Sequence, residues 1–186
     1  MRPKEYRIKE LLREKGLDGA IVSSPENFHY VTGFGGHQHT VSRQPGFTLA
    51  VMRADDKVPT HLTTMDFEAA TFRIKAAGLN FVVDPYDTWV GLKTWDEIAH
   101  GAVVPDKTAM ESSMDKKVGV ELDYLPVPYY KSLTEKFPEA EFVDISDLFV
   151  YARSVKQPDE IEMFRKLCRI ADHGFTEVSK IAKIGV

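Results

Sequence analysis

Two histidines separated by one residue, His37 and His39, are the side chains of this sequence that most resemble metal ligands. Neutral imidazole binds Zn, Ni or Cu, and an extended segment would offer both rings together. A site needs a third and usually a fourth ligand, however, and no Cys or cluster of carboxylates lies nearby in the sequence. We therefore interpret both histidines as solvated residues of a loop and predict no metal site in this chain.

Other motifs that could carry chemistry are incomplete. The segment Gly33 to Gly36 resembles a phosphate-binding loop only in its glycines, because no Lys-Ser or Lys-Thr follows. The Gly-x-Ser-x-Gly elbow of serine hydrolases does not occur. The single thiol, Cys168, falls on the apolar face of a predicted helix, where a buried structural cysteine is the expected reading. The residues alone thus predict no catalytic site.

The stretch from Ser23 to Phe34 has the strongest local signals for structure. It follows a short apolar run, Gly19 to Val22, which has the length and β-branched content of a buried strand. Ser24 can cap a helix through its side-chain oxygen, and proline suits the first helical position that follows. Gly33 then permits a positive φ that ends the helix. We expect this turn to present Phe34 and the loop beyond it.

The composition excludes several classes of protein. A hydrophobic fraction of 43% and a charged fraction of 28% are ordinary for a soluble globular protein, and no apolar run is long enough to span a membrane. The net charge of −4, without a basic cluster, gives no reason to expect nucleic acid. One cysteine and the absence of an apolar secretory segment favour the cytoplasm. Small molecules and protein partners remain.

Alternating strands and helices predict an α/β fold, with three α/β/α layers around a mixed sheet of five or six strands. His37 to Pro45 lacks apolar periodicity and is expected to be an exposed loop, and Asp84 to Asp87 a turn. Asp66 can cap the helix that follows it. The other expected strands are Phe47 to Met52, Val58 to Thr63, Asn80 to Val83, Lys117 to Leu122 and Ala140 to Val143. The expected helices are Tyr6 to Lys15, Asp66 to Ala77, Trp89 to His100, Pro126 to Lys136 and Ile145 to Val155, whereas Val103 to Asp115 has no clear period.

A further helix begins at Pro158, with two acidic residues in its first turn. Its apolar residues recur every three or four positions over more than six turns, so the helix offers a wide apolar stripe to some other surface. The preceding domain can cover only part of that stripe. The stripe comprises Ile161, Phe164, Leu167, Cys168, Ala171, Phe175, Val178 and Ala182.

Two motifs in these segments resemble the creatinase and Xaa-Pro dipeptidase (prolidase) family. The first is Ser-Pro-Glu-Asn, an aromatic and Tyr-x-Thr-Gly-Phe, between Ser24 and Phe34. The second is Arg-x-x-Lys-x-Pro-x-Glu-Ile, from Arg153 to Ile161, and Gly185-Val186 follows the long helix as in the family. The resemblance implies an N-terminal domain with a ribonuclease-H-like arrangement over residues 1–155. It implies that residues 156–186 are a linking helix, cut off before a pita-bread catalytic domain.

The resemblance also carries functional expectations. Metallohydrolases of the family bind two divalent metals, Mn, Co or Zn, through residues of the catalytic domain, and creatinase works without metal; this chain alone is expected to be inert. In the family the N-terminal domain supports a homodimer, and the loop after Tyr-x-Thr-Gly-Phe reaches toward the substrate. Carried over, this makes Phe34, His37, His39 and Arg43 candidates for substrate contact, with Arg43 gripping a carboxylate. Dipeptide, creatine-like and other amide substrates all stay open.

A different class of function also fits the sequence. The chain could be a stand-alone domain that binds a small molecule or a protein and has no catalytic half. The apolar final helix argues against this alternative, and reading the coding sequence past Val186 would decide between the two.

Overall fold

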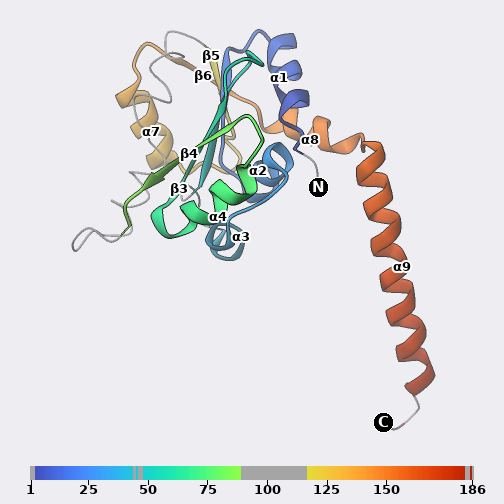
Figure 1. The fold of residues 1–186 in the computed structure, drawn as a ribbon. Coiled ribbons are helices and arrows are strands. Elements are labelled where there is room, and N and C mark those ends of the chain that lie inside the picture. The colour runs from blue at the N-terminus through green and yellow to red at the C-terminus, as the bar shows by residue number, and fades with distance from the viewer. Residues whose placement is uncertain (1–2, 44, 46–47, 89–116, 183–184, 186) are drawn as a thin grey trace.

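The computed structural model describes residues 3–43, 45, 48–88, 117–182 and 185. In these residues a mixed β-sheet is the central layer, helices pack on both of its faces, and one long helix leaves the layers (Figure 1). The predicted α/β/α class and the long C-terminal helix are confirmed.

Six strands of the described chain form the sheet, in the order β4-β3-β2-β1-β5-β6. β2 is antiparallel to both β1 and β3, whereas β5 pairs in parallel with β1 and β6, and β4 in parallel with β3. The sheet is therefore mixed, as predicted, with the larger of the two predicted strand numbers. The bounds are β1 Gly19–Val22, β2 Leu49–Arg53, β3 Thr60–Met65, β4 Phe81–Tyr86, β5 Lys117–Val120 and β6 Glu141–Asp144.

Four helices cover one face of the sheet: α1 (Glu5–Glu14), α2 (Pro25–Thr32), α4 (Asp66–Ala76) and α8 (Ser146–Ser154). Side chains alternate across a strand, so Ala20 and Val22 of β1 point into this layer while Ile21 points into the other. Phe28 of α2 and Phe72 of α4 are fully buried at its centre. This core anchors α2, on which the candidate site is built.

A second, smaller core lies on the opposite face, under α7 (Val127–Lys136). Leu133 of α7 packs there with Ile21 and Val51 of the sheet. Burial on both faces explains why β1 and β2 are continuous apolar runs rather than alternating ones. Within the described chain, no helix is both long and apolar enough to cross a bilayer.

Helix α9 (Pro158–Ile181) extends away from the layers (Figure 1). Glu160 accepts a hydrogen bond from the backbone N–H of Gln157 at 2.9 Å, which caps the helix start. Every residue from 161 to 181 is exposed, including Phe164 at 53% and Phe175 at 77%. Cys168 is exposed as well, so its predicted burial is wrong for this chain: no described element covers that face of the helix.

Two predicted boundaries are also wrong. β4 continues through the predicted turn to Tyr86, and Pro85 is tolerated because β4 is the outermost strand of the described sheet, where a missing N–H costs little. Asp66 is the first residue of α4 rather than its cap, since Met65 occupies the capping position. The predictions for Trp89 to His100, for Val103 to Asp115 and for Phe47 fall outside the described residues.

Candidate functional site

Helix α2 is the support of the candidate site, and local sequence explains its ends. Ser24 lies in an extended conformation, and its hydroxyl accepts a hydrogen bond from the backbone N–H of Asn27 at 3.4 Å. Pro25 occupies the first helical position. Gly33 adopts a φ of 81°, a left-handed conformation that favours glycine, and its N–H bonds to the carbonyl of His29. The predicted cap, start and end of this helix are confirmed.

A buried carboxylate lies beneath the start of α2. Glu121, which directly follows β5, is 1% exposed and accepts hydrogen bonds from Ser23, Ser24 and Asn27. The donors are the backbone N–H groups of both serines, their hydroxyls, and the side-chain amide of Asn27, 2.5 Å from Oε1. These bonds give both buried oxygens of Glu121 hydrogen-bond partners. Glu121 was not among the predicted site residues; an acidic residue inside the predicted strand Lys117 to Leu122 was the signal that could have indicated it.

Phe34 is not presented to solvent as predicted. It is 9% exposed and belongs to the core, with ring centroids 5.4 Å from Phe72 and 6.4 Å from Phe28 and from Phe81. The ammonium group of Lys75 lies 5.7 Å from its ring centroid. The left-handed turn at Gly33 sends the ring back between α2 and α4, because three apolar rings gather there.

The segment after Phe34 forms a short helix, α3 (His37–Ser42), instead of the predicted irregular loop. Its start is held by Glu68 of α4, whose Oε1 accepts a hydrogen bond from the N–H of Gln38 at 3.0 Å. Gly36 allows this approach, since a Cβ there would lie 2.6 Å from Oε2 of Glu68. The helix is stabilised by tertiary contacts that apolar periodicity does not report.

The two histidines of α3 lie in different environments. His37 is exposed, whereas His39 is fully buried and its ring packs edge-on against Phe28. Nε2 of His39 lies 2.8 Å from the carbonyl oxygen of Ser23, so Nε2 carries the proton and donates. Burial lowers the pKa of His39, which favours the neutral ring. The prediction of two solvated histidines is therefore wrong for His39.

Arg43 ends α3 and remains exposed. It adopts a φ of 52°, unusual for a residue with a side chain. Its guanidinium lies 2.6 Å from the Glu26 carboxylate, and its carbonyl accepts a hydrogen bond from the Tyr124 hydroxyl at 2.8 Å. The hydrogen bond from Arg43 lowers the pKa of Glu26, and burial raises the pKa of Tyr124 to about 12. Arg43 is thus held at the surface, with one edge of its guanidinium already bonded to Glu26.

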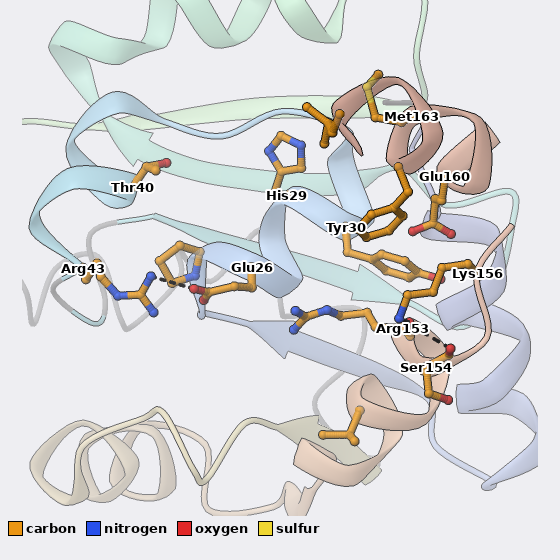
Figure 2. Close-up of a pocket in the computed structure, with 14 residues that line it drawn as sticks. Glu26, His29, Tyr30, Thr40, Arg43, Arg153, Ser154, Lys156, Glu160 and Met163 are labelled. Atoms are coloured by element: carbon orange, nitrogen blue, oxygen red, sulfur yellow. Dashed lines mark hydrogen bonds and ion pairs between the residues drawn. The ribbon is translucent and has the colours of Figure 1, made fainter. Parts of the chain in front are cut away.

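A groove of about 750 Å³ opens beside Arg43, between α2, α8 and the first turns of α9 (Figure 2). Figure 2 shows Arg43 and Arg153 on either side of Glu26, and Arg153 contributes to the lowered pKa of this carboxylate. The groove is lined by Pro25, Glu26, His29, Tyr30, Thr40, Arg43, Val150, Arg153, Ser154, Lys156, Glu160, Met163, Phe164 and Leu167. Its lining suits a ligand or chain segment with both apolar and charged groups.

The structure thus divides the four predicted contact residues. Phe34 and His39 are buried in the domain, where they support α3, while His37 and Arg43 are exposed at its two ends. Of these four, Arg43 lines the groove. Among the described residues, no group of three or more His, Cys, Asp or Glu side chains is arranged to hold a metal ion.

The fold is that of a three-layer α/β/α domain with a mixed sheet of six strands in the described chain, and it carries the two motifs at the start of α2 and before α9. The family described as the Creatinase/Prolidase N-terminal domain matches residues 6–155, and the chain belongs to it.

Among curated relatives, an uncharacterized peptidase, YqhT, of Bacillus subtilis is 25% identical over 182 residues, and an ectoine hydrolase of Halomonas elongata is 22% identical over 185. Each alignment covers 97% of this chain but 44% of the relative, so the chain spans less than half of their length. The solved X-Pro aminopeptidase of Thermotoga maritima has a similar fold, with a TM-score of 0.73 and 17% identity over 97% of this chain and 44% of that one.

Proposed function

We propose that this chain is the non-catalytic N-terminal domain of a creatinase or Xaa-Pro dipeptidase-like hydrolase, to which it contributes substrate-gating and dimer contacts. The observation that carries the proposal is the exposed apolar face of α9, in a chain that spans 44% of the length of the two curated relatives named above. An uncovered stripe of this length is a surface for another domain or subunit. In the proposed protein the rest of the enzyme covers it.

The gating part of the proposal rests on Arg43. This residue is exposed, lies next to the groove, and is held by Glu26 and Tyr124 in a conformation that would otherwise be unfavourable. One edge of its guanidinium bonds Glu26, which leaves other N–H donors to bind a carboxylate of a small peptide or amide substrate. The exposed ring of His37 adds a hydrogen-bonding group at the other end of α3.

Substitution of Arg43 tests the gating role in the longer enzyme. A hydrogen bond to a charged group contributes about 1.5–3 kcal/mol, so R43A should lower kcat/KM by roughly 10- to 150-fold. The matched control is R13A, which removes another exposed arginine with an acidic partner, on α1. Unchanged kcat and KM in R43A would refute the gating role and leave the assignment to the family intact.

The catalytic part of the proposal places two divalent metals, Mn, Co or Zn, in the remainder of a metal-dependent enzyme. The described residues offer no cluster for such ions. The 186-residue chain, incubated with each metal, should therefore hydrolyse no Xaa-Pro dipeptide. Hydrolysis that co-purifies with the chain through a second column would show that the chain itself is catalytic and would overturn this part of the proposal.

The dimer part of the proposal is tested separately. Sedimentation equilibrium of the longer enzyme should give twice the mass of one chain across a range of concentrations. A monomer at all concentrations would remove the dimer role without affecting the Arg43 experiment.

A further inference from the structure

We propose that a chain of hydrogen bonds, His39–Ser23–Glu121–Asn27–Arg153, holds the arm (residues 34–43) and the base of α9 in a fixed relation, so that the two move as one body. This inference concerns the described chain itself and goes beyond the role proposed for Arg43. The chain of bonds begins in α3, passes beneath α2, and ends in the last turn of α8, five residues before α9 begins.

The first half of the chain fixes the arm to the sheet. Nε2 of His39 donates to the carbonyl of Ser23 at 2.8 Å, and the N–H of the same serine donates to the Glu121 carboxylate. All three residues are at most 1% exposed. Hydrogen bonds that are shielded from water resist exchange for solvent partners, so α3 is attached firmly to the carboxyl ends of β1 and β5.

Asn27 carries the connection to α8, and its orientation is dictated by chemistry. A carboxylate oxygen accepts hydrogen bonds, so the side-chain NH₂ of Asn27 faces Glu121, where it lies 2.5 Å from Oε1. The amide oxygen is then turned the other way and accepts a hydrogen bond from Arg153 at 2.9 Å. Glu121 therefore determines which group is offered to Arg153.

Further contacts hold the junction between α8 and α9 against α1 and α2. The hydroxyl of Tyr30 donates to the carbonyl of Ala152 at 3.1 Å, and Arg7 donates to the carbonyl of Val155 at 2.8 Å. Lys4 pairs with Asp159 in the first turn of α9 at 2.5 Å. These contacts fix the junction on the domain, and Asn27 and Arg153 add its connection to the arm.

The arrangement joins the two motifs that carry the family resemblance. Asn27 belongs to Ser-Pro-Glu-Asn and Arg153 opens Arg-x-x-Lys-x-Pro-x-Glu-Ile, yet they are 126 positions apart in the sequence. Glu121, which belongs to neither motif, completes the link. A displacement of α9 is therefore transmitted to the arm through side chains, because α2 cannot shift at Asn27 without breaking one of these bonds.

A distance measurement between α3 and α9 tests this coupling. Cys168 is the only cysteine and is exposed on α9, so the single substitution V41C, at an exposed position of α3, completes a pair of spin-label sites. Double electron–electron resonance on this labelled protein should give one narrow distance distribution. R153A removes an exposed side chain, so we expect this variant to fold. It should broaden the distance distribution.

Comparison of variants separates coupling from a general loss of structure. N27A should broaden the distribution as R153A does, and the double variant no further than either single one, because each breaks the same link. R153K, which retains a donor, should restore part of the narrow peak. K117A, which removes an exposed ion pair with Glu141, is the control that should change nothing. An unchanged distribution in R153A, or effects of N27A and R153A that add, would overturn the proposal.

Discussion

Replacement of Phe34 by alanine should reduce stability strongly, because the structure makes this residue part of the core. The ring lies at the meeting point of α2, α4 and β4, with Phe28, Phe72 and Phe81 around it. Removal of a buried phenylalanine costs about 3–5 kcal/mol, from lost burial and from the cavity that remains. Edge-to-face contacts contribute about 0.5–1.5 kcal/mol per pair. We therefore expect F34A to lose about 4–5 kcal/mol of unfolding free energy, the upper half of the range for a buried phenylalanine.

Urea unfolding followed by circular dichroism measures this loss. The midpoint should shift to lower urea without a change in the slope, since the mutation alters stability rather than the surface exposed on unfolding. F34L keeps most of the apolar volume and should lose less than about 1.5 kcal/mol. F67A is the matched control, because Phe67 is 55% exposed on the outer side of α4, and it should stay within about 0.5 kcal/mol of the wild type.

A loss in F34A no larger than that in F67A would refute the burial of this ring. The same result would favour the exposed position that was predicted for Phe34 from the sequence.

Two further predictions concern protonation and exposure. Because burial lowers the folded-state pKa of His39 below its unfolded value of about 6.5, the unfolded chain binds the proton first, and stability should fall as pH decreases below that value. H39Q should flatten this dependence in urea midpoints measured across that range. H29Q should remove only part of it, since His29 is exposed, although its pKa is lowered in the same direction. An unaltered slope in H39Q would contradict the reasoning. Cys168 should react with a soluble disulfide reagent in the native 186-residue chain as fast as a free thiol, and much more slowly in the longer enzyme that we propose. Equal rates in both proteins would show that nothing covers this face of α9.

Local signals made part of the site predictable from sequence. Ser24, Pro25 and Gly33 define the ends of α2 through their own backbone and side-chain preferences, so the helix could be placed without knowledge of its neighbours. The apolar runs of β1 and β2 were equally readable, because each is buried on both faces.

The remainder depends on contacts between distant residues. Gly33 indicated a turn but not its direction. Phe34 points into the core because it packs there against the rings of Phe72 and Phe81. α3 lacks an apolar stripe, and Glu68 from another helix holds its start. The irregular-loop prediction therefore failed where tertiary hydrogen bonds replaced periodicity.

The buried state of His39 follows from the same limit. A histidine in a polar segment is ordinarily solvated, and its pairing with the carbonyl of Ser23 becomes visible only when the chain has folded back over α2. Arg43 and Glu26 were both readable as surface residues, but their pairing across 17 positions was not.

The exposed face of α9 has a consequence for synthesis of the proposed longer enzyme. Domains generally fold as units while the chain emerges, at about 5–20 residues per second, so the layers of this domain can form before the remainder is made. During the following interval, roughly tens of seconds for a segment somewhat longer than this one, Phe164 and Phe175 remain open to water and to other nascent chains. Of the described segments, the helix that would join the two halves of the enzyme then offers a chaperone the most exposed apolar surface.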